Sequence, residues 1–578
     1  MKGALGPGAV SDPIRLEVFN QRLLAITEEM GAHLVRCSFS PNIKERRDCS
    51  VALFDSAGRV LAQAAHIPIH LGSLVGGVEA VLRRYPPETM APGDAFVCND
   101  AYLAGGTHLP DIAVITPVFW ADEVRYFVGC VGHHADVGGA VPGSISPDAG
   151  SIFEEGIRIP PTRLSRGGDV DENVLELIAH NTREPEERML DLRVQAAVNA
   201  RGVRNVYALV ERMGLAAVEA AVRDLVTYTA RRLERRIEVI PDGRYVGRAY
   251  MDNDGAHSER VPIVVTATVE GARLSFDCAG TGSQSRGAYN VMPSGVLATI
   301  AYAVKALVDP ELPPNRALFE AIDVEVPLGT ILNPRFPAAV GARTTTCQKL
   351  AGAIFAAFEP LLEPGSAMAP SHDVLAAMVF SGAAPRRDGA YVYLETVGGG
   401  IGATGRQDGA DGAHVHITNS LNMPVEAVEL EYPLLVEEYA LLADSGGAGE
   451  FRGGLGIARE VRILEPSTTF SARADGFEAV APGARGGGSG SRCQVVHNRG
   501  RPGERCMEPK QRLLRVDPGD TIRMETPGGA GFGDPALRAP GTLADDLADG
   551  KATEAGARQA FGDALVDAAL ALSTTGGG

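Results

Sequence analysis

The sequence lacks the segments that would place a protein in a membrane, in a secretory pathway or on nucleic acid. None of its apolar runs reaches the roughly 18 residues that a membrane helix needs. No continuous apolar segment precedes Asp12, as a secretory signal would require. The formal net charge of −18 repels phosphate backbones. We therefore expect a cytoplasmic protein that binds neither membranes nor nucleic acid.

Cysteine pairs and the common catalytic patterns are also missing. The eight cysteines are scattered and form no C-x-x-C pair, which argues against a zinc ribbon and a disulfide framework. The glycine-rich stretches 280–290 and 398–412 lack the Lys-Ser/Thr of a phosphate-binding loop. No segment fits the G-x-S-x-G nucleophile pattern. Cys347 and Lys349 could form a nucleophile pair, but a buried cysteine on an apolar helix face is the favoured interpretation.

The chain is long and rich in glycine. Its 578 residues exceed the roughly 250–300 that one core accommodates, and its 69 glycines gather in clusters typical of turns. Helical and strand patterns mix without a steady β-α-β rhythm, which predicts a multidomain α+β fold with Gly-rich turns. We expect an N-terminal domain over 1–236 with a helical segment at 172–236, a central α+β domain over 237–376, a β-rich domain over 377–540 and a helical tail over 541–578.

Local patterns predict the elements that matter for function. Residues 14–36 have helical spacing after a Ser-Asp-Pro start, which is a typical helix N-terminus. Alternating apolar residues predict a hairpin over 50–63 and a second hairpin over 112–131. Residues 73–87 predict a short helix that ends at proline.

Histidine and aspartate cluster at the ends of the second hairpin. The stretch GGTHLPD precedes it, GHHADVGG follows it, and KERRDCS comes before the first hairpin. The candidate residues are Asp48, His108, Asp111, His133, His134 and Asp136. Imidazoles with carboxylates suit zinc, manganese or iron and leave positions open for water or substrate. The alternative is ordinary polar loops, because these spacings are less specific than H-E-x-x-H.

Two further histidine pairs stay open on sequence grounds. His66 and His70 share a face in either a helix or a strand, and Pro68 between them argues against a helix. Hydrogen-bonded histidines lining a strand are favoured over metal ligands there. His414 and His416 alternate as in a strand, and a second metal is the less favoured interpretation.

Taken in order, seven blocks of the chain resemble the hydantoinase B family. The blocks are ERRDCSVALFD, HIPIHLGS, CNDAYLAGGTHLPDIAVITPVF, GHHADVGGAVPGS, NTREPEERMLDLRVQAAVNARG, DSGGAGEFRGGLG and TPGGAGFGDP. The family includes B subunits of ATP-dependent N-methylhydantoinases, the C-terminal half of 5-oxoprolinases, and subunits of acetone and acetophenone carboxylases. The resemblance covers about residues 12–565 and is specific for the family but not for the substrate.

The resemblance implies a division of labour between two proteins. A hydantoinase A-type partner subunit with an actin-like ATPase fold binds ATP and phosphorylates the substrate, and the B-type subunit acts on the activated intermediate. The implied metal ligands are Asp48, His108, Asp111 and His133. His134 and Asp136 are then expected to orient these ligands, to serve as alternative ligands, or to act as the general base.

The expected function is therefore that of a metal-dependent subunit of an ATP-dependent cyclic amidase in a hetero-oligomer. One alternative is a subunit of an ATP-dependent ketone carboxylase, in which the metal stabilises an enolate or enol phosphate. A second alternative is a non-catalytic scaffold, which would leave the clustered histidines and aspartates unexplained.

Overall fold

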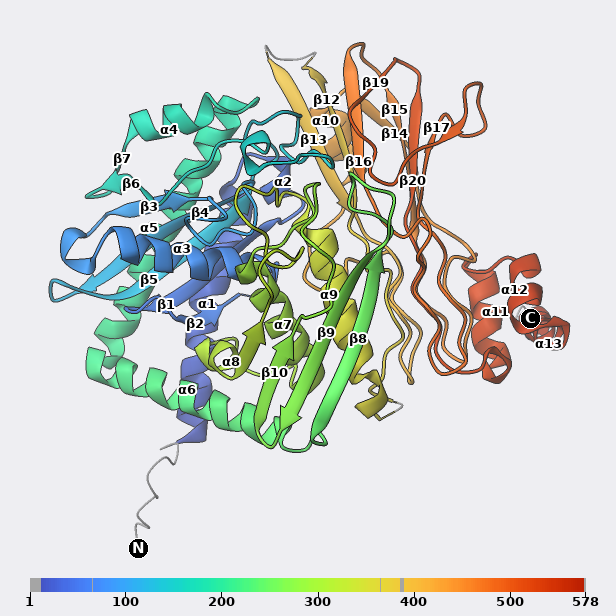
Figure 1. The fold of residues 1–578 in the computed structure, drawn as a ribbon, viewed down its shortest axis with the longest axis horizontal. Coiled ribbons are helices and arrows are strands. Elements are labelled where there is room, and N and C mark those ends of the chain that lie inside the picture. Colours follow the sequence, from blue (N-terminus) through green and yellow to red (C-terminus); the bar gives the residue numbers. More distant parts are fainter. Residues whose placement is uncertain (1–11, 65, 364, 385–388, 576–578) are drawn as a thin grey trace, which may run out of the picture. The chain divides into compact units, whose positions relative to one another are not determined.

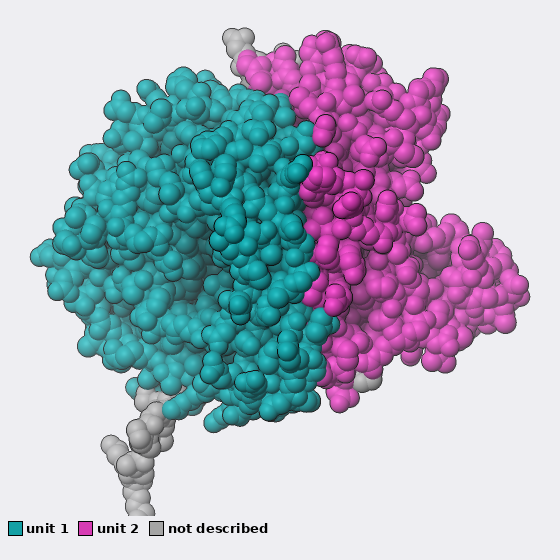
Figure 2. Space-filling model, in the orientation of Figure 1, with its two compact units in different colours: residues 1–246, 265–343 teal, residues 247–264, 344–578 magenta. Residues whose placement is uncertain are grey.

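The computed structural model describes residues 12–575 apart from 65, 364 and 385–388 (Figure 1). The chain forms two compact units (Figure 2). Unit 1 comprises Met1–Val246 and Val265–Arg343, and unit 2 comprises Gly247–Val264 and Thr344–Gly578. Both units combine helices with sheets, which confirms the predicted multidomain α+β class. The finer division into four segments stays a prediction.

A seven-stranded antiparallel sheet organises unit 1, in the order β2-β1-β5-β4-β3-β6-β7. Its strands are β1 (Cys49–Asp55), β2 (Val60–Gln63), β3 (Ala95–Cys98), β4 (Asp111–Trp120), β5 (Glu123–His133), β6 (Thr162–Arg166) and β7 (Asp169–Val170). Both predicted hairpins are confirmed, as β1–β2 and β4–β5. In the second hairpin the first residue of β4, Asp111, pairs directly with the last residue of β5, His133.

Helices cover both faces of this sheet, so its central strands are buried on both sides. The helices α1 (Pro13–Cys37) and α5 (Pro185–Met213) pack on one face, and α3 (His70–Arg84) packs on the other. Burial on both sides explains why β4 is almost continuously apolar instead of alternating. Helix α1 begins where predicted, because the Asp12 side chain accepts hydrogen bonds from two N–H groups of the first turn.

The remaining elements of unit 1 surround this core. They are α2 (Pro41–Lys44), α4 (Glu172–Ala179), α6 (Leu215–Ile237), α7 (Pro293–Val308), α8 (Arg316–Glu320) and the 3₁₀ turns η1 (Pro87–Thr89) and η2 (Ile152–Glu154). Helices α4, α5 and α6 confirm the helical segment predicted at 172–236. A second sheet has the order β11-β10-β9-β8 and contains β8 (Gly243–Met251), β9 (Val261–Glu270), β10 (Arg273–Asp277) and β11 (Ile322–Glu325). The parts of β8 and β9 that lie within Gly247–Val264 are assigned to unit 2.

Unit 2 contains two antiparallel sheets, β13-β12-β16-β19 and β14-β15-β20-β17-β18. The strands are β12 (Ala376–Ala383), β13 (Ala390–Val397), β14 (Leu434–Leu441), β15 (Ile457–Ile463), β16 (Thr468–Arg473), β17 (Gln494–His497), β18 (Arg505–Cys506), β19 (Leu514–Val516) and β20 (Thr521–Glu525). The helices and 3₁₀ turns are α9 (Arg343–Phe358), η3 (Glu359–Leu361), α10 (Val425–Glu431), η4 (Pro535–Leu537), α11 (Pro540–Ala548), α12 (Glu554–Phe561) and α13 (Asp563–Thr575).

Many glycines of unit 2 allow backbone segments to pack against each other directly. A Cβ atom on Gly454 would lie 1.9 Å from the Ala410 carbonyl oxygen, and one on Gly529 would lie 2.1 Å from that of Ile401. These segments also exchange hydrogen bonds, such as Gly454 N–H to the Ile401 carbonyl at 2.8 Å. The stretch 398–412 is therefore packed directly against other backbone segments of unit 2. Within the described part of the chain, no helix has both the length and the apolar character needed to cross a bilayer.

Candidate metal centre

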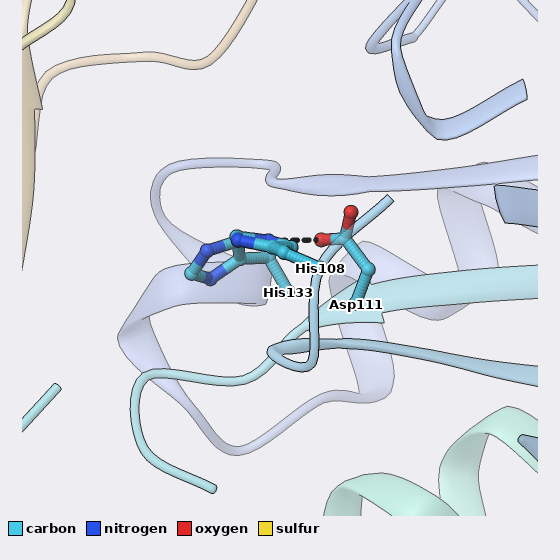
Figure 3. Close-up of side chains that lie close together, drawn as sticks. All are labelled: His108, Asp111 and His133. Atoms are coloured by element: carbon cyan, nitrogen blue, oxygen red, sulfur yellow. Dashed lines mark ion pairs between the residues drawn. The ribbon is translucent and has the colours of Figure 1, made fainter. Parts of the chain in front are cut away.

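Two strand ends and one loop meet at one end of the seven-stranded sheet. Asp111 begins β4, His133 ends β5, and His108 lies in the loop three residues before Asp111. One potential ligand atom from each of these residues lies within 4.8 Å of the other two, and all three residues are buried (Figure 3). The structure therefore brings together three of the four residues expected to bind a metal.

The hydrogen bond of His108 determines which of its nitrogens has a free lone pair. Nδ1 lies 2.9 Å from the Gly341 carbonyl oxygen. Because a carbonyl only accepts, Nδ1 carries the proton and Nε2 keeps its lone pair. Burial, reinforced by the Arg343 guanidinium, lowers the pKa of His108, so the ring is neutral.

The lone pair on His108 Nε2 points at a carboxylate oxygen of Asp111. Its Nε2 lies 3.0 Å from Asp111 Oδ1, and both atoms are buried without a hydrogen-bond partner (Figure 3). Burial opposes ionisation of Asp111, but His108, His70 and Arg343, the last 2.7 Å away, hold the pKa of this carboxyl well below its usual range. Two acceptors facing each other repel one another, and either a shared proton or a metal cation bound by both removes the repulsion.

The donor set fits a divalent metal. Two ligand atoms each bonded at about 2.1 Å to one ion, with an angle near 90° between the bonds, lie about 3 Å apart, which is the separation of His108 Nε2 and Asp111 Oδ1. Imidazole nitrogen with carboxylate oxygen suits zinc, manganese or iron. This set of atoms does not discriminate among those three metals.

His133 is held in place from the side of α2. Asn42 Nδ2 lies 2.9 Å from His133 Nδ1 and donates to the His133 carbonyl oxygen at 2.8 Å. Arg46 in turn donates to the Asn42 Oδ1 atom, which fixes the orientation of that amide. Burial and the neighbouring His108 lower the pKa of His133 well below its usual value, so this ring is also neutral. Because an amide NH₂ group only donates, Asn42 occupies the Nδ1 lone pair and Nε2 carries the proton, so His133 becomes a metal ligand only when that contact breaks or that proton leaves.

Asp48, the fourth expected ligand, reaches the group through His70. The Asp48 carboxylate lies 3.5 Å from His70 Nε2 and 3.7 Å from Arg46. The same His70 nitrogen lies 3.4 Å from Asp111 Oδ1, so one imidazole connects the two carboxylates. The interpretation of His66 and His70 as histidines lining a strand was wrong for His70, which is the first residue of helix α3, two residues after Pro68. His66 instead lines a cavity of about 670 Å³ beside α1, α6 and α7.

Two buried guanidinium groups balance the two carboxylates. Arg46 contacts Asp48, and Arg343 donates to Asp111 Oδ2 at 2.7 Å and to the Thr107 hydroxyl at 3.1 Å. The two guanidinium charges match the two carboxylate charges of Asp48 and Asp111. A divalent ion would make the centre positive, which favours anionic ligands.

The structure does not bring His134 into this group. Side chains alternate along a strand, and His134 faces α5 while His133 faces the centre. Arg188 Nη1 lies 2.8 Å from His134 Nδ1, and Gln195 Oε1 lies 3.1 Å from Nε2. Because arginine only donates, the lone pair on Nδ1 is occupied, and His134 has no free nitrogen with which to act as a base.

Asp136 also lies apart, in the loop that follows β5. Its carboxylate accepts from the N–H groups of Gly138, Gly143 and Arg183 and from the Arg183 guanidinium, at 2.8–3.1 Å. These contacts connect the loop to the segment before α5. Asp136 therefore holds backbone in place beside the centre, whereas His134 binds side chains of α5.

The other candidates belong to unit 2. His416 Nε2 lies 2.6 Å from Asp373 Oδ1, and His414 lies two residues away. Among the described residues, the group of His108, Asp111 and His133 alone meets the spacing for three metal-capable side chains. Cys347 is fully buried on α9, as the sequence favoured, and Lys349 pairs with Asp475 at 3.4 Å.

Sequence comparison finds related proteins across nearly the whole chain. The family model described as Hydantoinase B/oxoprolinase matches residues 12–535. An uncharacterized protein of Methanocaldococcus jannaschii is 34% identical over 93% of this chain and 94% of its own length. The beta subunit of the caprolactamase of Pseudomonas jessenii is 31% identical over 95% of this chain and 96% of its own length. The 5-oxoprolinase 1 of Arabidopsis thaliana is 32% identical over 91% of this chain, which spans 42% of that protein.

Solved structures show the same fold. The crystal structure of the ATP-dependent caprolactamase from Pseudomonas jessenii superposes with a TM-score of 0.89 at 29% identity, over 98% of this chain and 99% of that chain. The nucleotide-free acetone carboxylase structure has a TM-score of 0.88 at 20% identity, over 98% of this chain and 83% of that chain. At that lower identity the likeness shows a shared fold.

Proposed function

The chain belongs to the hydantoinase B/oxoprolinase family, and from this we propose that it is the metal-dependent subunit of an ATP-dependent cyclic amidase. Its relatives include ATP-dependent amidases and carboxylases. The observation that carries the proposal is the buried pair of facing acceptors, His108 Nε2 and Asp111 Oδ1. Such a pair is costly in a protein without a metal and is stabilised by a bound cation.

We propose that a partner subunit of the hydantoinase A type binds ATP in the cytoplasm. The sequence shows no phosphate-binding loop, and the caprolactamase relative is named as a beta subunit. The partner would phosphorylate the amide oxygen of the substrate. The resulting imidate phosphate carries negative charge, which suits a centre that becomes positive when a divalent ion is bound.

A divalent metal held by His108, Asp111 and His133, with Asp48 beside it, would lower the pKa of water and polarise the substrate. The chain itself supplies proton transfer and charge. His70, whose Nε2–H lies between the Asp48 and Asp111 carboxylates, gives a proton to the leaving nitrogen, and Asp48 takes the proton of the attacking water. Addition of water and cleavage of the C–N bond give an amine and an acyl phosphate. A second water hydrolyses the acyl phosphate to a carboxylate and inorganic phosphate.

The experiment combines the purified chain with an A-type ATPase subunit, ATP and a panel of cyclic amides. We expect ATP-dependent ring opening, together with a metal content that His108→Ala and His133→Ala both abolish. The exposed His180, which lies outside the centre, provides the matched control His180→Ala. Full metal occupancy in both variants would refute the site. Unchanged activity after loss of all four ligands would favour a scaffold.

Ketone carboxylation is the second candidate, because acetone carboxylase shares the fold. The test adds labelled bicarbonate and a ketone to the same complex. Label in the product without ring opening of any cyclic amide would establish carboxylation and overturn the amidase proposal.

A further inference from the structure

The segment 337–343 contributes two contacts to the centre without contributing a ligand. The Gly341 carbonyl accepts the proton of His108 Nδ1 at 2.9 Å, and Arg343 donates to Asp111 at 2.7 Å. The first contact determines the tautomer of His108, and the second balances the charge of Asp111. The alignment of both residues therefore depends on what holds this segment in place.

A single buried carboxylate holds the segment from behind. Glu155 is 1% exposed. Its Oε2 accepts the N–H of Val340 at 3.0 Å, and its Oε1 accepts the N–H of Gly341 at 2.6 Å. Burial raises the pKa of Glu155 to about 8, and Arg343 opposes that rise. The N–H groups of Val340 and Gly341 oppose this rise more than Arg343 does, because both hydrogen bonds are stronger to the charged carboxylate.

Steric fit makes this contact specific. A Cβ atom on Gly341 would lie 2.7 Å from Glu155 Oε1 and 3.1 Å from the Ile145 side chain. Only glycine at position 341 therefore allows the carboxylate this close to the backbone. The neighbouring Glu154 is exposed, and its carboxylate accepts from the Gly150 N–H, away from this segment.

We infer that Glu155 is a positioning residue, which sets the metal affinity of the centre by holding the backbone at 340–341 and through it His108 and Arg343. It touches none of the four expected ligands. The inference rests on the proposed metal site. It adds a residue that no local sequence pattern marks as part of that site.

The test measures the dissociation constant of the isolated full-length chain for Zn²⁺ and Mn²⁺ by competition with a fluorescent chelator. Glu155→Leu removes both acceptor oxygens at similar volume, and we expect affinity to fall about 10–100-fold. Glu155→Gln keeps an acceptor oxygen and should restore part of the affinity. Glu154→Leu, the matched control next in the chain, should leave affinity unchanged.

Gly341→Ala provides a second route that keeps every polar group. Its added methyl group displaces the Glu155 carboxylate and should weaken metal binding to a similar extent. With Co²⁺ as the probe, the visible absorption bands should shift in Glu155→Leu and Gly341→Ala but not in Glu154→Leu, because the altered contacts surround the ligands.

The outcomes separate this inference from the proposed function. Wild-type affinity in both Glu155→Leu and Gly341→Ala would overturn the role of Glu155 and leave the metal site standing. A wild-type chain that binds neither ion would overturn the metal site itself. Near-ultraviolet circular dichroism shows whether each variant is folded, and Gly341→Ala decides the question if Glu155→Leu does not fold.

Discussion

The substitution Asp111→Asn separates the two tasks of this carboxylate. Asp111 Oδ2 accepts from Thr107 and Arg343, while Oδ1 faces His108. An asparagine can place its oxygen toward Thr107 and Arg343 and its NH₂ group toward His108 Nε2. The repulsive pair of acceptors then becomes a hydrogen bond, but an anionic metal ligand is lost.

The expected effect of Asp111→Asn on the free energy of unfolding differs sharply between the metal-free and the metal-bound protein. In the metal-free protein the new hydrogen bond contributes about 1 kcal/mol, and the weaker contact with Arg343 costs about 1–3 kcal/mol. The free energy of unfolding should therefore change by at most about 2 kcal/mol. With metal at about 1,000 times Kd, wild-type protein gains about 4 kcal/mol, which the variant lacks.

Thermal unfolding measures this difference. The unfolding entropy is about 2 cal/mol/K per residue, so for a unit of about 300 residues 4 kcal/mol corresponds to a rise in Tm of about 6 °C. We expect metal to raise the Tm of chelator-treated wild type by that amount and that of Asp111→Asn by less than about 1 °C.

Asp55→Asn is the matched control. Asp55 ends β1 in the same sheet and pairs with Arg59 and Arg316, so its loss should leave the metal-induced rise in Tm intact. The reasoning is refuted if Asp111→Asn retains the rise. It is also refuted if the metal-free variant unfolds far below metal-free wild type, because the carboxylate would then serve mainly to pair with Arg343.

Three further predictions concern His134, Asp136 and the cysteines of the chain. Burial and Arg188 lower the pKa of His134 from 6.5 to about 4, so the unfolded chain binds the extra proton. The free energy of unfolding should then fall by up to about 3 kcal/mol between pH 6.5 and 4, and chemical denaturation should show a shallower fall in His134→Gln. Asp136→Asn should lower stability by about 1–3 kcal/mol while the Kd for metal, measured by titration, stays unchanged. Only Cys37 and Cys506 are exposed among the eight cysteines, so a thiol reagent should label two thiols in the native chain and eight after denaturation.

Periodicity and turn chemistry were sufficient to predict helix α1 and the two hairpins of the first sheet. The hairpin that joins Asp111 to His133 follows from alternating apolar residues on either side of a short turn. The same alternation implied that His133 and His134 point to opposite faces. Applied one step further, it would have removed His134 from the list of candidate bases.

Other features could not be predicted, because their partners lie far away in the chain. Nothing near Glu155 or Gly341 in the sequence indicates that they meet, since their contact depends on the folded unit. The glycine-rich stretch 398–412 was expected to form turns, whereas many of its glycines serve close packing of backbone on backbone. Composition alone does not distinguish these two uses of glycine.

The order in which the chain is made bears on when a metal can be retained. The carbonyl that binds His108, that of Gly341, lies 233 residues further along the chain, and the guanidinium of Arg343, which binds Asp111, lies 232 residues further along. At about 5–20 residues per second, a ribosome leaves these side chains without their later partners for roughly 10–50 seconds. An ion that arrives in this interval meets a histidine of undetermined tautomer and an unbalanced carboxylate. At the proposed metal site, tight retention would therefore begin only once residue 343 is in place, so a firmly held ion would mark a completed unit 1.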